Sequence, residues 1–146
     1  VCGSNGQCSG SLAACCAGNH IATCGSTLSG ETAPVGKPSL VDVWPCYADF
    51  NMDGPETIMS FTAPCDGTAT FHYDGPAGSL LFGVREGDPF PTAQDACLEG
   101  ACESYSPSGF SAELSEGETM LLVIDLWSSQ TLQGVYELET LCDCAP

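Results

Sequence analysis

Cysteine is the residue type that most constrains how this chain folds. Eleven of its 146 residues are cysteines, a density typical of proteins that fold in an oxidising compartment. The spacings Cys97-x4-Cys102 and Cys142-x-Cys144 do not match the C-x2-C pairs of zinc sites. We therefore expect disulfide bonds and a secreted, extracellular or cell-surface location. The start at Val1, without a methionine or an apolar leader, predicts a mature chain whose signal peptide has been removed.

Every cysteine is a candidate for a disulfide within the chain or between subunits. The candidates are Cys2, Cys8, Cys15, Cys16, Cys24, Cys46, Cys65, Cys97, Cys102, Cys142 and Cys144. Because the count is odd, five internal bridges leave one cysteine over, which either pairs with another chain or stays a buried free thiol. Sequence does not fix the connectivity. Our hypothesis pairs Cys97 with Cys102, and Cys24 with Cys142 across the fold.

The charge balance excludes several functions. Nineteen acids face only two bases, Lys37 and Arg85, and the formal net charge is −17. A nucleic-acid-binding protein needs a basic stripe, and an anionic membrane surface repels an acidic protein. Apolar runs are also too short to insert into a membrane. Most of the carboxylates must therefore face water, accept backbone N–H bonds or bind a cation.

Short apolar or alternating segments, separated by turn residues, predict an all-β chain. The expected strands are 39–44, 57–63, 68–73, 79–85, 109–115, 118–125 and 135–141. This pattern, without a helical period, is typical of an antiparallel β-sandwich of jelly-roll type. Residues 118–125 are apolar on both faces, which predicts a central strand. The segment from Glu86 to Pro107 is expected to be a long loop that wraps a sheet edge.

Three regions are expected along the chain. Residues 1–24 form an uncharged, cysteine-rich, irregular arm with too few large apolar residues for a core of its own. Residues 25–38 are a connector rich in Gly, Pro, Ser and Thr, and residues 39–146 form the sandwich domain.

From about Cys24 to Cys142, the order of short motifs resembles the bacterial pre-peptidase C-terminal (PPC) domain in a cysteine-rich form. The matching pieces are DGPE at 53–56, FTAP at 61–64, DGTATF at 66–71, LFGVREG at 81–87, EGETMLLVID at 116–125 and GVYEL at 134–138. The resemblance implies a secreted, non-catalytic sandwich that aids secretion or binds a substrate, in some cases with calcium. The N-terminal arm has no counterpart in this pattern.

A calcium loop is predicted at Asp49, Asn51 and Asp53, which is followed by Gly54. Ca²⁺ takes several oxygen ligands, and the glycine permits a sharp turn. The twelfth position of this loop is Ser60, so it is not an EF-hand, and Glu56 or Asp42 would complete the site. The alternative is an Asx-rich turn without a metal. Calcium is the one cofactor that the sequence suggests.

No catalytic set emerges from the two histidines. His72 falls within an expected strand and points away from the side of Phe71 and Tyr73, which is typical of a residue on a sheet face. His20 lies in the cysteine-rich arm. No G-x-S-x-G motif is present. We therefore expect no enzyme activity.

Three functions remain. The first is a self-assembling structural subunit of a disulfide-stabilised extracellular filament or surface layer, whose partners are copies of itself joined by strand pairing or disulfides. The second is a secreted, PPC-like module that binds polysaccharide or protein, with or without calcium. The third, a small inhibitor-like or toxin-like protein, has only the N-terminal cysteine spacing in its favour.

Overall fold

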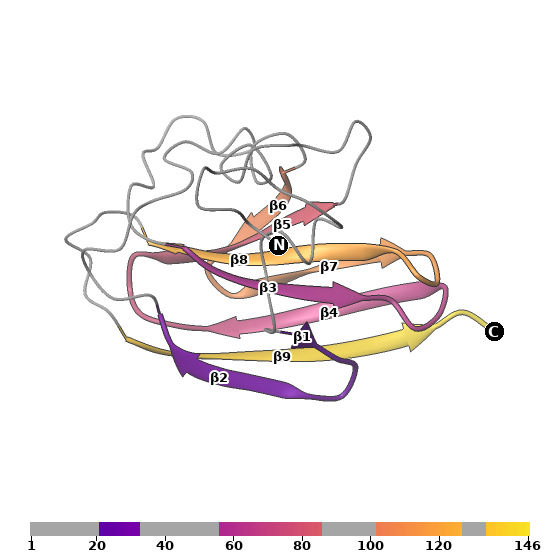
Figure 1. The fold of residues 1–146 in the computed structure, drawn as a ribbon, viewed down its shortest axis with the longest axis horizontal. Coiled ribbons are helices and arrows are strands. Elements are labelled where there is room, and N and C mark those ends of the chain that lie inside the picture. The colour runs from indigo at the N-terminus through magenta and orange to yellow at the C-terminus, as the bar shows by residue number, and fades with distance from the viewer. Residues whose placement is uncertain (1–20, 33–55, 86–101, 127–133) are drawn as a thin grey trace, which may run out of the picture.

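The computed structural model describes residues 21–32, 56–85, 102–126 and 134–146. These residues form nine strands in two sheets that pack face to face (Figure 1). Within the described ranges there is no helix, and so none that could cross a membrane. The all-β sandwich predicted from the sequence is confirmed.

One sheet has five strands in the order β1-β3-β8-β5-β6. Their bounds are β1 Ile21–Ala22, β3 Thr57–Thr62, β5 Ser79–Arg85, β6 Cys102–Ser106 and β8 Thr119–Leu126. The pairs are antiparallel except for β1 with β3, which is parallel. The apolar strand β8 lies at the centre of this sheet, as its sequence predicts.

The other sheet has four antiparallel strands in the order β2-β9-β4-β7. Their bounds are β2 Thr27–Glu31, β4 Gly67–Asp74, β7 Gly109–Leu114 and β9 Val135–Cys144. Buried and exposed residues alternate along β9, with Tyr136 and Leu138 inside and Glu137 and Glu139 outside, as predicted. In β7, Gly109 has a φ of 106°, and a Cβ there would lie 1.8 Å from the carbonyl oxygen of Phe71. Only glycine therefore fits at this start of the strand.

Three strands lie where the sequence predicted none. β1 falls in the expected arm, β2 falls in the expected connector, and β6 occupies the end of the expected long loop. The sandwich therefore begins well before residue 39, because β2 pairs along its whole length with β9. Residues 39–44, expected to be a strand, lie outside the described residues.

The core lies between the sheets and is built from alternate residues of both. Phe61 of β3 and Phe71 of β4 meet edge to face across the two layers, with ring centroids 5.3 Å apart. Met59, Leu122 and Leu138 are fully buried in the same cluster. Burying such side chains supplies most of the stability of a domain like this, at roughly 1.5–3 kcal/mol each.

The outer faces of the two sheets differ. On the five-stranded sheet, Phe82, Val84, Leu121 and Val123 alternate with core residues, yet each is 0% exposed. On the four-stranded sheet, the residues that alternate with the core are mostly polar and are exposed or partly exposed, and they include the exposed apolar residues Val135 and Leu141. Within the described residues, only the four-stranded sheet thus presents a broad face to solvent.

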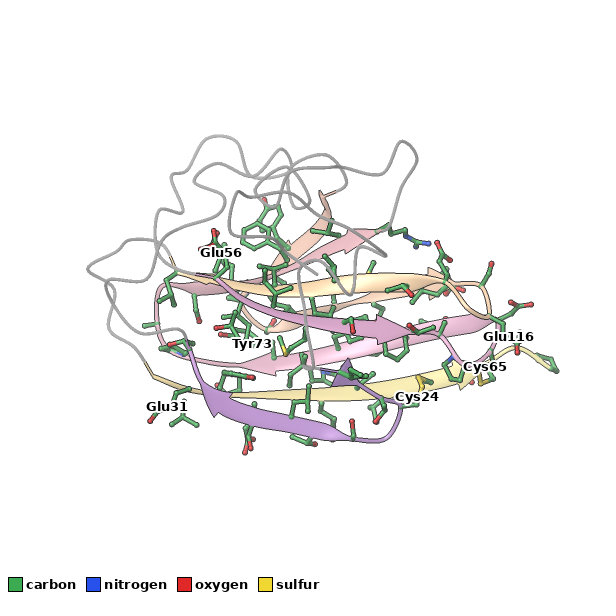
Figure 2. The ribbon with its side chains drawn as sticks, viewed as in Figure 1. Cys24, Glu31, Glu56, Cys65, Tyr73 and Glu116 are labelled. Carbon is green, nitrogen blue, oxygen red and sulfur yellow. A yellow bond between two sulfur atoms is a disulfide. The ribbon has the colours of Figure 1, made fainter. Side chains whose placement is uncertain are left out.

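Two disulfides fasten strand β9 to the places where the chain passes between sheets. Cys24, in the turn from β1 to β2, is bonded to Cys142, and the Cα atoms lie 5.5 Å apart. Cys65, in the turn from β3 to β4, is bonded to Cys144, with Cα atoms 5.7 Å apart. Figure 2 shows Cys24 and Cys65 toward the same end of the sandwich. The predicted Cys24–Cys142 pair is confirmed.

Removing a disulfide should destabilise the fold by an amount that grows with the loop it closes. The Cys24–Cys142 bond spans 118 residues and the Cys65–Cys144 bond spans 79. Because the two loops overlap, either bond closes an effective loop of only about 43 residues while the other is intact, so we expect Cys24→Ser/Cys142→Ser and Cys65→Ser/Cys144→Ser each to lose about 4.0 kcal/mol of unfolding free energy. Urea unfolding measures both. A loss below about 1 kcal/mol for either variant would contradict the role given to these bonds.

Candidate binding face

The candidate functional site is the outer face of the four-stranded sheet, which we call the acidic face. Its side chains come from alternate positions of all four strands, and register places them in rows across the sheet. It consists of Thr27, Ser29, Glu31, Thr68, Thr70, His72, Asp74, Gly109, Ser111, Glu113, Val135, Glu137, Glu139, Leu141 and Asp143. The face holds six carboxylates and no lysine or arginine among its own residues.

Two of these carboxylates oppose each other directly. Asp74 of β4 and Glu137 of β9 are register partners, and both are exposed. Like charges at directly opposite positions of a sheet destabilise the pairing. One row along, Glu139 is opposite His72 on one side and Thr27 on the other. Thr27, His72, Asp74, Glu137 and Glu139 line a shallow, open depression.

The centre of the face is less charged. Leu141 of β9 is opposite Thr70 of β4, which is opposite Ser111 of β7. The Thr70 and Ser111 hydroxyls are hydrogen-bonded to each other at 2.9 Å, and Leu141 is 43% exposed. Farther along the strands, the Thr68 hydroxyl donates a hydrogen bond to the Glu113 carboxylate. Carboxylates thus flank an apolar and hydroxyl-bearing centre on two sides.

Arg85 is the single base in the described part of the chain, and it is engaged elsewhere. Its guanidinium forms an ion pair with Glu118 at 2.7 Å and donates to the Glu113 carbonyl oxygen at 2.6 Å. The pKa of Glu118 is lowered, first by the hydrogen bond from the Ser115 N–H and then by the one from Arg85. Arg85 therefore ties β5 to the end of β7 and to the β7–β8 turn.

Beneath the acidic face, Tyr73 fixes the end of β4. Its buried hydroxyl is hydrogen-bonded to the Ser79 hydroxyl at 2.8 Å, and the Ser79 hydroxyl donates to the Pro76 carbonyl oxygen at 2.5 Å. Burial is the main reason that the pKa of Tyr73 is raised, so the phenol stays neutral. Because Tyr73 lies between His72 and Asp74 in the strand, this network holds both of those face residues in place.

The predicted metal site falls almost entirely outside the described residues. The structure does not describe Asp49, Asn51 or Asp53. Glu56 is described; it directly precedes β3 and is half-buried. In the ranges that the structure describes, no three His, Cys, Asp or Glu side chains are grouped so as to hold a metal ion. The calcium loop stays a prediction.

Four of the candidate disulfide cysteines are accounted for. Cys24, Cys65, Cys142 and Cys144 form the two internal bonds. The Cys65–Cys144 bond was not predicted, although the Cys-x-Cys spacing places both C-terminal cysteines on one side of β9. Cys102 is the first residue of β6. The Cys97–Cys102 pair stays a prediction, because Cys97 lies outside the described residues. The other cysteines outside the described residues are Cys2, Cys8, Cys15, Cys16 and Cys46.

The acidic face could be predicted only in part from the sequence. Alternation predicted that Glu137 and Glu139 share one side of their strand and that His72 lies on a sheet face, and both predictions are confirmed. Alternation within a strand does not show which strands are neighbours. The opposition of Asp74 and Glu137 needed the β4–β9 register.

Comparison with known proteins finds similar folds but no similar sequences. No family model and no curated protein sequence matches this chain. Among solved structures, it is similar to PliG of Aeromonas hydrophila, a periplasmic inhibitor of g-type lysozyme, with a TM-score of 0.52, 9% identity, and coverage of 81% of this chain and 85% of that chain. It is also similar to the pre-peptidase C-terminal domain of collagenase from Bacillus anthracis, with a TM-score of 0.47, 12% identity, and coverage of 83% and 92%. The likeness to PliG is one of fold, and a PPC domain is also among the similar structures.

The opposed carboxylates lead to a prediction about stability. Glu137→Gln should raise the unfolding free energy by about 0.2–1 kcal/mol at low ionic strength, because it removes a like-charge cross-strand pair. Asp74→Asn should have the same effect, and the double variant should gain no more than either single change. The gain should shrink in high salt. Urea unfolding of the four proteins measures these terms, and a destabilised Glu137→Gln protein would contradict the repulsion.

Proposed function

We propose that this chain is an extracytoplasmic, non-catalytic domain that binds another macromolecule through the acidic face. The observation that carries the proposal is the contrast between the two outer sheet faces. One is completely buried at Phe82, Val84, Leu121 and Val123, whereas the other is exposed across all four strands. The two internal disulfides support a location in an oxidising compartment.

A binding role fits the chemistry of the face better than a catalytic one. His72 is exposed, and the depression beside it contains neither a serine nor a cysteine that it would activate. The carboxylates lie on a flat, open sheet and not across a deep cleft. The Aeromonas protein, an inhibitor of g-type lysozyme, is a sandwich with a binding role. The likeness to it is one of fold, so our proposal depends on the acidic face and not on that protein.

The proposal is tested by blocking the centre of the face. Thr70→Arg places a long cation between Leu141 and Ser111, and Ser115→Arg makes the same charge change in the β7–β8 turn as a matched control. The probes are chitin, cellulose and peptidoglycan as polysaccharides, and cytochrome c and serum albumin as proteins.

We expect saturable binding of at least one probe, reduced at least tenfold by Thr70→Arg and retained by Ser115→Arg. Circular dichroism checks that both variants are folded. Failure to bind any of the probes, or equal binding by the wild type and Thr70→Arg, would overturn the proposal.

A second candidate is self-assembly into a filament or surface layer, and the edge strand β2 favours it. The outer side of β2 is paired with no other strand in the part of the chain that the structure describes. Exposed edge strands are templates for pairing with another chain. Cys142 and Cys144 both form disulfides within the chain, so an intermolecular disulfide would have to come from the other seven cysteines. Because seven is an odd number, these cysteines cannot all pair with one another within the chain.

Assembly predicts a ladder of species on a non-reducing gel that collapses on reduction to the 15.1 kDa chain. Strand pairing also predicts that Ser29→Lys, which puts a cation on the edge strand, lowers the sedimentation coefficient of the native protein. A monomer in sedimentation velocity, together with one band on both gels, would overturn this candidate.

A further inference from the structure

The distribution of carboxylates over the acidic face limits which kinds of partner it could bind. Carboxylates occur on all four strands of the sheet, but no three lie close enough together to hold a metal ion in the described part of the chain. Strands in a sheet are about 4.8 Å apart, and alternate residues along a strand are about 7 Å apart. A complementary ligand must therefore carry several positive charges over a comparably broad surface.

The second observation is that Asp74 and Glu137 are direct register partners and that no lysine or arginine is among the residues of the face. We expect this like-charge pair to lower the stability of the free domain. A cationic partner relieves it on binding, because its charges replace repulsion by attraction. Residues that lower stability without serving the core are typical of functional surfaces.

The centre of the face adds an apolar contact point. Leu141 is 43% exposed beside the hydroxyls of Thr70 and Ser111, and Val135, 68% exposed, lies at one end of the same strand. An apolar centre with a charged rim is the arrangement found in protein–protein interfaces. Polysaccharide sites instead stack sugar rings on aromatic side chains, and the residues of the acidic face include no Phe, Tyr or Trp.

We propose that the acidic face docks onto a cationic protein surface, with Leu141 as the apolar anchor and Glu137 and Glu139 as the rim charges that select the partner. This inference depends on the proposed binding function and specifies its partner. Carboxylates opposite lysine and arginine side chains raise the association rate and suppress wrong partners.

The test uses cytochrome c as the cationic probe and succinylated cytochrome c, whose lysine charges are reversed, as its matched control. We expect the native domain to bind the first and not the second, with an affinity that falls as salt rises. Glu139→Gln should weaken binding about fivefold, as should Leu141→Ser. Two matched variants outside the face, Glu116→Gln and Ile21→Ser, should stay within about twofold of the wild type.

Glu137→Gln separates a binding role from a structural one. It should weaken binding to cytochrome c while raising the stability of the free domain, a combination that a merely damaged fold does not produce. Equal binding of succinylated cytochrome c, or equal losses in Glu116→Gln and Glu139→Gln, would overturn the inference. Binding of a polysaccharide that Thr70→Arg abolishes, without binding of cytochrome c, would overturn the inference and leave the proposed function standing.

Discussion

The fold depends on how strand β9 is held. β9 lies between β2 and β4 in the four-stranded sheet, and its C-terminal end carries both described disulfides. These bonds join β9 to Cys24 and Cys65, which lie in the turns where the chain passes from one sheet to the other. Backbone hydrogen bonds from Gly25 to Thr140 and from Ala145 to Asp66 reinforce the same two junctions. A small domain with a modest core gains more from fixing such crossings than from adding surface ion pairs, for which this chain has almost no bases.

The acidic face is a consequence of that arrangement. Because β9 is central, Glu137, Glu139 and Leu141 lie in the middle of a broad surface and not at its edge. Arg85 belongs to the other sheet, where its guanidinium forms an ion pair with Glu118 and donates a hydrogen bond to the Glu113 carbonyl oxygen. In the part of the chain that the structure describes, the fold thus gathers negative charge on the sheet face that is open to solvent, and it brings the exposed Leu141 in among those charges.

Much of this architecture was predictable from local patterns. Alternation located β7 and β9, short apolar segments between turn residues located β3, β4 and β5, and the continuous apolar run located β8 as a central strand. These signals are local, because the residues of a strand reflect which of its faces are buried. β2, with the sequence TLSGE, has no strong β-preference, and Leu28 is its one large apolar residue, which packs half-buried against the core. It is a strand because β9 supplies its hydrogen bonds, and such a tertiary cause leaves no local signal. Two other features could not be predicted for the same reason, since both depend on which strands are neighbours. They are the Cys65–Cys144 disulfide and the opposition of Asp74 and Glu137.

Docking at the acidic face is tested most directly by an NMR titration of the ¹⁵N-labelled domain with cytochrome c, followed amide by amide. If the acidic face is the docking surface, the shifts should be largest at Glu137–Leu141 and Thr70–Asp74, and succinylated cytochrome c should leave these amides unchanged. Shifts concentrated around Glu116 in the β7–β8 turn, or around Ile21 in β1, would show that cytochrome c docks elsewhere and not on the acidic face.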